Sequence, residues 1–77
     1  MNAGMLWFDN STKKDLKAKV IDAATHYRDK YGAVPNMCFV HPSMLGEKQK
    51  EMKVGRVEIK PDGTVLPHHL FMGERGK

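Results

Sequence analysis

The histidines of this chain are the residues best suited to metal or acid–base chemistry. Two are adjacent in the segment PHHL, and a third, His41, follows an apolar run. His41, His68 and His69 are the set that a small metal site or an acid–base enzyme would use. However, consecutive side chains of a regular strand point to opposite faces. No H-E-x-x-H, C-x-x-C or H-x-H spacing occurs, which favours one buried and one exposed histidine on an edge strand, with no cofactor.

Cys38 is the one cysteine of the chain and lies within the apolar run MCFV. A thiol in apolar surroundings should have a raised pKa and stay protonated, which makes it a core residue rather than a nucleophile. One cysteine excludes an internal disulfide, which is typical of a reducing compartment. We therefore expect a cytoplasmic protein.

A second group of polar residues follows two predicted strands. Asp9 and Asn10 come after the run MLWF, and His41 and Ser43 come after MCFV. The carboxyl ends of parallel strands meet at one edge of a sheet, where ligands tend to bind. These four residues are therefore a candidate anion or ligand site. The alternative is that Asn10 and Ser43 only cap the elements that follow them.

One amphipathic helix is predicted over residues 12–31. Its apolar residues recur at spacings of four, four, three and four: Leu16, Val20, Ala24, Tyr27 and Tyr31. Asn10 or Ser11 is a suitable N-cap, and Gly32 is a suitable C-cap before Pro35. The helix lies between strands predicted at 5–8 and 37–40. This order predicts a right-handed βαβ unit with parallel strands.

The last third of the chain predicts a hairpin. Residues 54–60 alternate between apolar and charged side chains, as in a half-buried strand. The PDG at 61–63 is typical of a turn, so we expect a hairpin over 54–66 with Arg56 and Lys60 on one face. Pro67 then favours an edge position or a bend for the last strand, HHLFM.

Together these elements predict a single α+β domain over residues 1–77, with one long helix packed on a mixed sheet of about four strands. Residues 1–4 and 73–77 are expected to be loose termini, and Met5 is an alternative start. No apolar run approaches the ~20 residues of a membrane span, so no membrane partner is expected. The helix covers only one sheet face, so the other needs a cover. That cover is either the turn near Met44 and Leu45 or a second copy of the chain.

Basic residues near the predicted hairpin are a possible nucleic-acid surface. The net charge is +4, which permits weak attraction to phosphates. The residues that would make this contact are Lys48, Lys50, Lys53, Arg56 and Lys60. Interleaved glutamates weaken their field. In addition, we expect no exposed aromatic pair on the sheet that would stack bases.

These observations favour a small interaction or accessory module over an enzyme. Its contact surface would be the uncovered sheet face or the last strand beside Pro67, and the expected partner is a protein, either a second copy in a homodimer or another chain. One alternative is a weak nucleic-acid or anion binder. The other is a small metal-dependent or acid–base enzyme centred on His41, His68 and His69.

Overall fold

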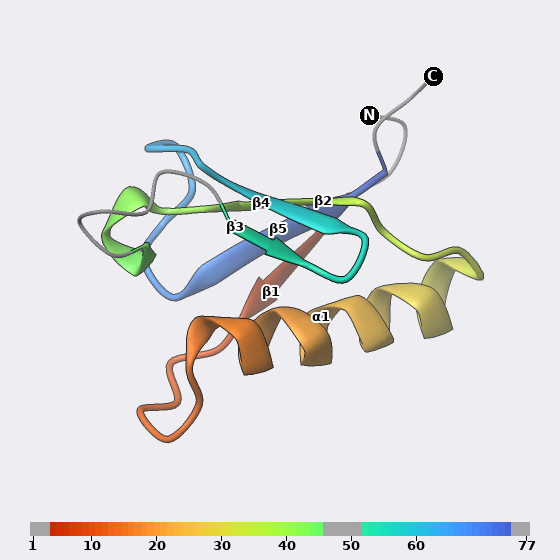
Figure 1. Cartoon of the computed structure of the whole chain (residues 1–77), viewed down its shortest axis with the longest axis horizontal. Coiled ribbons are helices and arrows are strands. Elements are labelled where there is room, and N and C mark those ends of the chain that lie inside the picture. The colour runs from red at the N-terminus through yellow and green to blue at the C-terminus, as the bar shows by residue number, and fades with distance from the viewer. Residues whose placement is uncertain (1–3, 46–51, 75–77) are drawn as a thin grey trace.

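The computed structural model describes residues 4–45 and 52–74. In these ranges a five-stranded mixed sheet lies over one helix (Figure 1). The elements in chain order are β1 (Gly4–Phe8), α1 (Leu16–Tyr31), β2 (Met37–Val40), the short 3-10 helix η1 (Pro42–Met44), β3 (Met52–Val54), β4 (Val57–Pro61) and β5 (His69–Gly73). The predicted α+β class is therefore confirmed.

Helix α1 begins four residues later than the sequence predicts, because its N-cap is Asp15. The Asp15 carboxylate accepts a hydrogen bond from the Ala18 N–H at 2.9 Å, which satisfies one free donor of the first turn. The predicted caps Asn10 and Ser11 precede the helix and do not cap it. The predicted C-cap is confirmed: Gly32 adopts φ 72° and its N–H donates to the Arg28 carbonyl at 2.8 Å.

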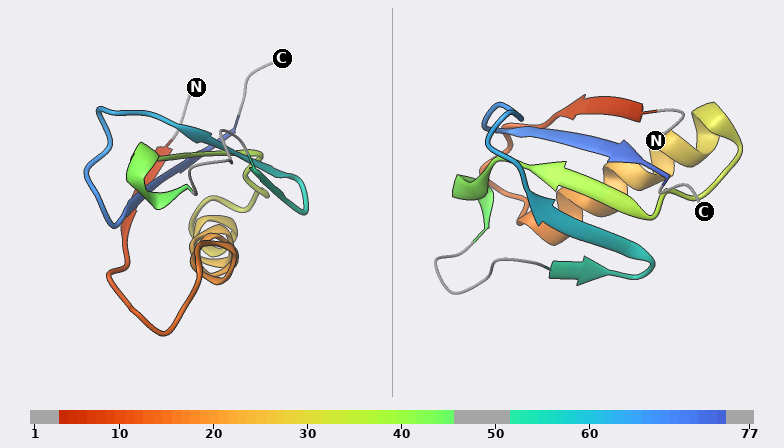
Figure 2. Two further views of the ribbon diagram at one scale, coloured as in Figure 1. Left: turned by 60° about the vertical axis from the view of Figure 1, so that its left-hand side comes forward. Right: turned by 90° about the horizontal axis from the view of Figure 1, so that it is seen from above.

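The strand order across the sheet is β1-β5-β2-β4-β3 (Figure 2). β5 is antiparallel to both β1 and β2, so β1 and β2 run in the same direction, as predicted, but are not neighbours. β4 pairs parallel to β2, and β3 pairs antiparallel to β4. The helix therefore connects two parallel strands between which the last strand of the sheet is inserted.

The predicted hairpin over residues 54–66 is wrong. The hairpin joins β3 to β4 through the two-residue turn Gly55–Arg56, and Val54 faces Val57 across it. Gly55 has φ 59°, and glycine at the first central position of a two-residue hairpin suits a type II′ turn. The apolar and charged residues that alternate on either side of Gly55 therefore belong to two strands, β3 and β4. The sequence pattern predicts a single strand there.

The PDG turn instead ends β4 and starts the connection to β5. The Asp62 carboxylate accepts hydrogen bonds from the Thr64 hydroxyl at 2.6 Å and from the Thr64 N–H at 2.9 Å. These two bonds lower the pKa of Asp62, because they stabilise its ionised form. The predicted turn at 61–63 is therefore confirmed, but after it the chain crosses to the far side of β2.

Of the two alternatives predicted from Pro67, a bend or an edge strand, the bend is confirmed and the edge position of the last strand is wrong. β5 is central, with β1 on one side and β2 on the other. Pro67 lies before the strand, in a bend where His68 adopts φ 67°, so its missing N–H costs the sheet nothing. Gly4 and Gly73, at the margins of the predicted loose termini, pair with each other in the sheet.

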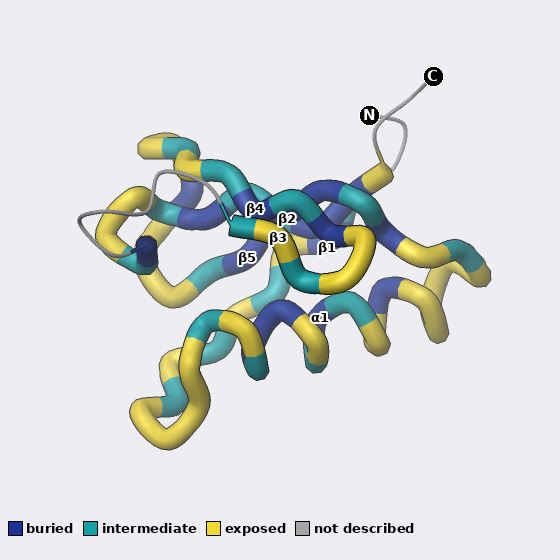
Figure 3. Tube along the Cα trace, in the orientation of Figure 1, coloured by how far each residue is buried: buried dark blue, intermediate teal, exposed yellow. Residues whose placement is uncertain are grey.

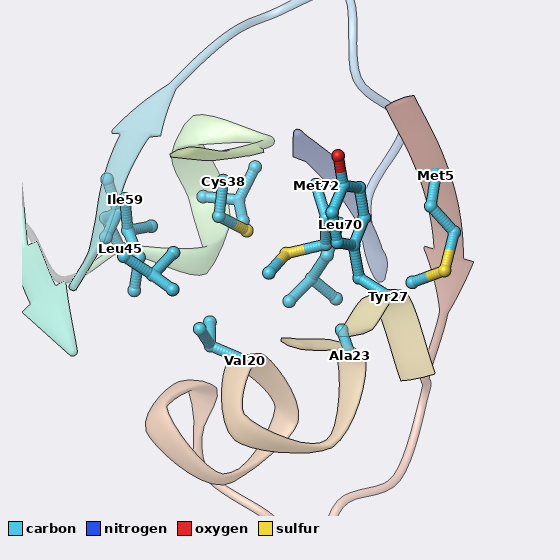
Figure 4. Close-up of a cluster of buried hydrophobic side chains, with 11 residues drawn as sticks. Met5, Val20, Ala23, Tyr27, Cys38, Leu45, Ile59, Leu70 and Met72 are labelled. Carbon is cyan, nitrogen blue, oxygen red and sulfur yellow. The ribbon is translucent and has the colours of Figure 1, made fainter. Parts of the chain in front are cut away.

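The core lies between α1 and one face of the sheet (Figures 3 and 4). Val20, Ala23 and Tyr27 of α1 are fully buried against the strands. The strand residues of this core are Met5, Cys38, Val40, Val57, Ile59, Leu70 and Met72. Leu45, just after η1, joins the same cluster. The opposite face of the sheet, called the open face below, carries no helix in the described parts of the chain (Figure 2).

Candidate functional site

The residues of the predicted anion site follow β1 and β2, two parallel strands that are not neighbours in the sheet. The Asp9 carboxylate accepts the Ser11 N–H at 2.9 Å, while His41 Nδ1 accepts the Ser43 N–H at 3.1 Å and lies 2.8 Å from the Ser43 hydroxyl. Each pair is thus satisfied locally, after β1 and after β2. The insertion of β5 separates these two strand ends, and Asn10 is exposed in the loop before α1.

The three histidines of the predicted metal or acid–base site make different local contacts. His41 bonds Ser43, whereas His68 is exposed in the bend before β5. The ring of His69 packs on Phe8 with 5.0 Å between centroids, and its Nδ1 lies 2.9 Å from the Pro67 carbonyl oxygen. No three His, Cys, Asp or Glu side chains in the described ranges are close enough together to hold a metal ion.

Cys38 is fully buried in the core, on β2. Burial raises the pKa of its thiol to about 12, because the thiolate would lose its hydration there. A thiol that stays protonated and out of reach of solvent is a poor nucleophile. The prediction of a core role for Cys38 is therefore confirmed.

The predicted basic surface divides into different parts of the hairpin. Lys60 and Lys53 lie on the open face, but Arg56 is in the turn, so the prediction that Arg56 and Lys60 share one face is wrong. Lys48 and Lys50 lie outside the described residues.

One row of side chains on the open face was missed at the sequence level. Strand register places Leu6, Phe71, Phe39 and Lys60 side by side on β1, β5, β2 and β4. Cross-strand partners point to the same face, so two aromatic side chains, Phe71 and Phe39, are adjacent here, and both are half-buried. The Phe71 ring lies over Gly4, where an added Cβ would be 2.3 Å from Cζ of the ring.

Comparison of the chain with protein-family models, curated proteins and solved structures finds no match. Within the described residues, no helix combines the length and apolar character needed to cross a bilayer. The surfaces of the fold are therefore the basis for any functional inference.

The free edge of β1 is the most exposed apolar element of the sheet. Leu6 is 60% exposed and Phe8 is 56% exposed, both on the open face. The Asp9 N–H donates to the His68 carbonyl at 2.9 Å, in continuation of the pairing of β1 with β5. Because bonded and non-bonded pairs alternate in an antiparallel ladder, Gly4, Leu6 and Phe8 direct their backbone N–H and C=O groups outward.

Proposed function

We propose that this domain is a non-catalytic interaction module that pairs with a second copy of itself through the free edge of β1. The observation that carries the proposal is the composition of this edge: five residues, GMLWF, without charge or proline. Monomeric proteins usually protect edge strands with charges, prolines or bulges, because an unprotected edge accepts another strand. β3, at the other edge of the sheet, is shorter and carries Lys53 at its centre.

Antiparallel pairing of two β1 strands around a two-fold axis at Leu6 uses the outward backbone groups. Leu6 then faces Leu6 of the second copy, and each Phe8 faces Gly4 across the interface. A hydrogen-bonded pair at each of these positions satisfies the free N–H and C=O groups. The Tyr31 hydroxyl already donates to the Gly4 carbonyl at 3.2 Å, and this oxygen has a second lone pair for the new strand.

The surroundings of β1 also suit a second copy. A hollow of about 470 Å³ lies beside the strand, with Met5, Leu6 and Trp7 on one side and His26, Asp29 and Lys30 of α1 on the other. A two-fold interface brings the same patch of both copies together. The negative charge of Asp29 in one copy therefore complements the positive charge of Lys30 in the other. Joining the two sheets at β1 also makes their open faces one continuous apolar surface.

Substitution of Leu6 by lysine should abolish self-association. The two new ammonium groups would face each other at the two-fold axis, which weakens dimerisation by about a hundredfold or more, since opposed like charges cost several kcal/mol. Sedimentation velocity over a range of protein concentrations measures the effect. Val34→Lys is the matched control, because Val34 is 51% exposed and lies in the connection between α1 and β2, outside β1.

The dimer proposal fails if the unmodified chain sediments as a monomer at every concentration up to the high micromolar range. It fails equally if Leu6→Lys and Val34→Lys change the association constant to the same extent. Circular dichroism of both variants tests that the fold is retained.

A second candidate function, binding of single-stranded nucleic acid, is favoured by the row Phe71–Phe39–Lys60 on the open face. Aromatic side chains on neighbouring central strands stack unpaired bases, and an adjacent lysine attracts the phosphate backbone. The overall charge of +4 has the required sign.

Phe39→Ala should weaken the binding of a fluorescent twelve-nucleotide oligo-U or oligo-dT about 5- to 100-fold, because a lost base–aromatic stack costs ~1–3 kcal/mol. Fluorescence anisotropy at low salt measures this loss. Phe39→Leu is the control for lost apolar volume, and should weaken binding nearly as much because leucine has no ring. If neither oligonucleotide binds at low salt, this candidate is discarded.

A further inference from the structure

A groove of about 440 Å³ lies between α1 and the β3–β4 hairpin, on the helix side of the sheet and away from β1. Figure 2 shows the hairpin projecting past one side of the helix. The floor of the groove is apolar and includes Val20, Ala24, Val54 and Val57. Two large apolar residues in its lining are strongly exposed: Ile21 is 49% exposed and Val34 is 51% exposed.

Among the described residues, the charged side chains that line the groove are all cations: Lys17, Arg28 and Arg56. Neither Lys17 nor Arg56 forms an ion pair with a described residue. Arg28 lies 3.8 Å from the Asp29 carboxylate, and both side chains are exposed, so that pair is weak. The groove thus combines an apolar floor with unneutralised positive charge, which complements a ligand with both apolar and acidic groups.

The free edge of β3 runs beside this groove. The pair Val54–Val57 flanks a two-residue turn, where the flanking residues exchange hydrogen bonds. By alternation the backbone N–H and C=O of Lys53 point away from β4, toward the free edge. The backbone of an extended peptide can hydrogen-bond to this N–H and C=O. An aliphatic acid has no amide groups and cannot pair with the strand in this way.

We propose that this groove binds an extended, acidic peptide segment of a partner protein, as an added strand along β3. An apolar side chain of the peptide fills the groove against Ile21 and Val34, and its flanking carboxylates face Arg28, Arg56 and Lys17. This mode joins backbone pairing at a sheet edge with a side-chain pocket against a helix. An open groove suits a peptide better than a small ligand, since small-molecule sites usually enclose most of the ligand surface. The inference does not depend on the pairing of β1.

The test uses a fluorescein-labelled octapeptide of alternating glutamate and leucine, with binding followed by anisotropy at low salt. The double variant Arg28→Glu/Arg56→Glu should raise the dissociation constant by about tenfold or more, because two attractions become repulsions. Ile21→Glu should have a similar effect, because it places a charge in the apolar floor. Lys13→Glu is the control, since Lys13 is exposed before α1 and does not line the groove.

Three further probes distinguish this peptide mode from other binding. An octapeptide of alternating lysine and leucine should bind at least tenfold more weakly. The glutamate–leucine peptide with N-methylated backbone should also lose affinity, because it cannot pair with β3. Decanoate tests for a small amphiphile. The proposal is overturned if the acidic peptide does not bind at millimolar concentration, if the groove variants bind it as tightly as Lys13→Glu, or if decanoate binds and the peptide does not.

Discussion

Replacing Leu70 by alanine should lower the free energy of unfolding by about 2–5 kcal/mol, the usual cost of emptying a buried leucine site. Leu70 is fully buried at the centre of the sheet, between Trp7 of β1 and Val40 of β2. Neighbours held by strand pairing on both sides cannot easily collapse into the cavity. The total stability of a domain of 77 residues is roughly 4–12 kcal/mol, so this one change should remove a large share of it.

Urea unfolding followed by circular dichroism measures the effect. The matched control is Leu66→Ala, four residues earlier, because Leu66 is 65% exposed in the connection between β4 and β5. An exposed site of this kind should change stability by less than about 0.5 kcal/mol. Equal losses at the two positions would contradict a central, buried β5.

Alkaline pH should destabilise the domain through Cys38. Burial raises the pKa of this thiol from its ordinary 9.0 to about 12. Between these two values the unfolded chain releases the thiol proton and the folded chain keeps it, so the folded state binds more protons. Stability therefore falls as pH rises from about 9 toward 12, by up to about 1.4 kcal/mol per pH unit. Below pH 9 the contribution is constant.

Urea unfolding at a series of pH values from 8 to 11 measures this slope. Cys38→Ala removes the titrating group, so its stability, although lower at pH 8, should fall less steeply above pH 9. A smaller decrease in stability with pH should remain in both proteins at the alkaline end of this range. It comes from Tyr27, because burial also raises the pKa of its hydroxyl to about 12. Parallel curves for the two proteins would show that Cys38 is solvated in the folded state.

The elements that depend on local patterns were predictable from the sequence. The apolar residues spaced about four apart predict the main part of α1, and Gly32 predicts its C-terminal end. The apolar run at 37–40 predicts β2 with its correct bounds. The start of α1 was not predictable from cap preference alone, because several consecutive residues suit an N-cap. Only Asp15 has its carboxylate in reach of the Ala18 N–H.

Strand pairing over long distances explains the errors. The PDG sequence specifies a turn, but it does not specify whether the next segment returns beside β4 or crosses β2 to reach β5. Gly55 was the available signal for the true hairpin, since a glycine inside an alternating pattern often marks a turn or bulge. The row from Leu6 to Lys60 needed the register of four strands, and no local pattern contains it.

The groove between α1 and the β3–β4 hairpin could not be predicted from the sequence for the same reason. Lys17 and Arg28 belong to the helix and Arg56 to the hairpin turn, so their common environment arises from tertiary packing alone. The exposure of Leu6 and Phe8 likewise followed from the position of β1 at an edge. The sequence places Leu6 and Phe8 in a strand, but it does not show that this strand lies at an edge of the sheet.

The central position of β5 also fixes when the domain can fold during its synthesis. β1 leaves the ribosome first, yet its strand partner in the sheet is β5, the last of the five strands to be made. Until residues 69–73 emerge, β1 has no ladder to join and β2 is paired on one side only. The nascent domain therefore carries an unpaired apolar strand until β5 has been made, a state in which chaperones bind and neighbouring chains associate. Folding then waits for the contact of greatest sequence separation, which makes it slow for a chain of this size.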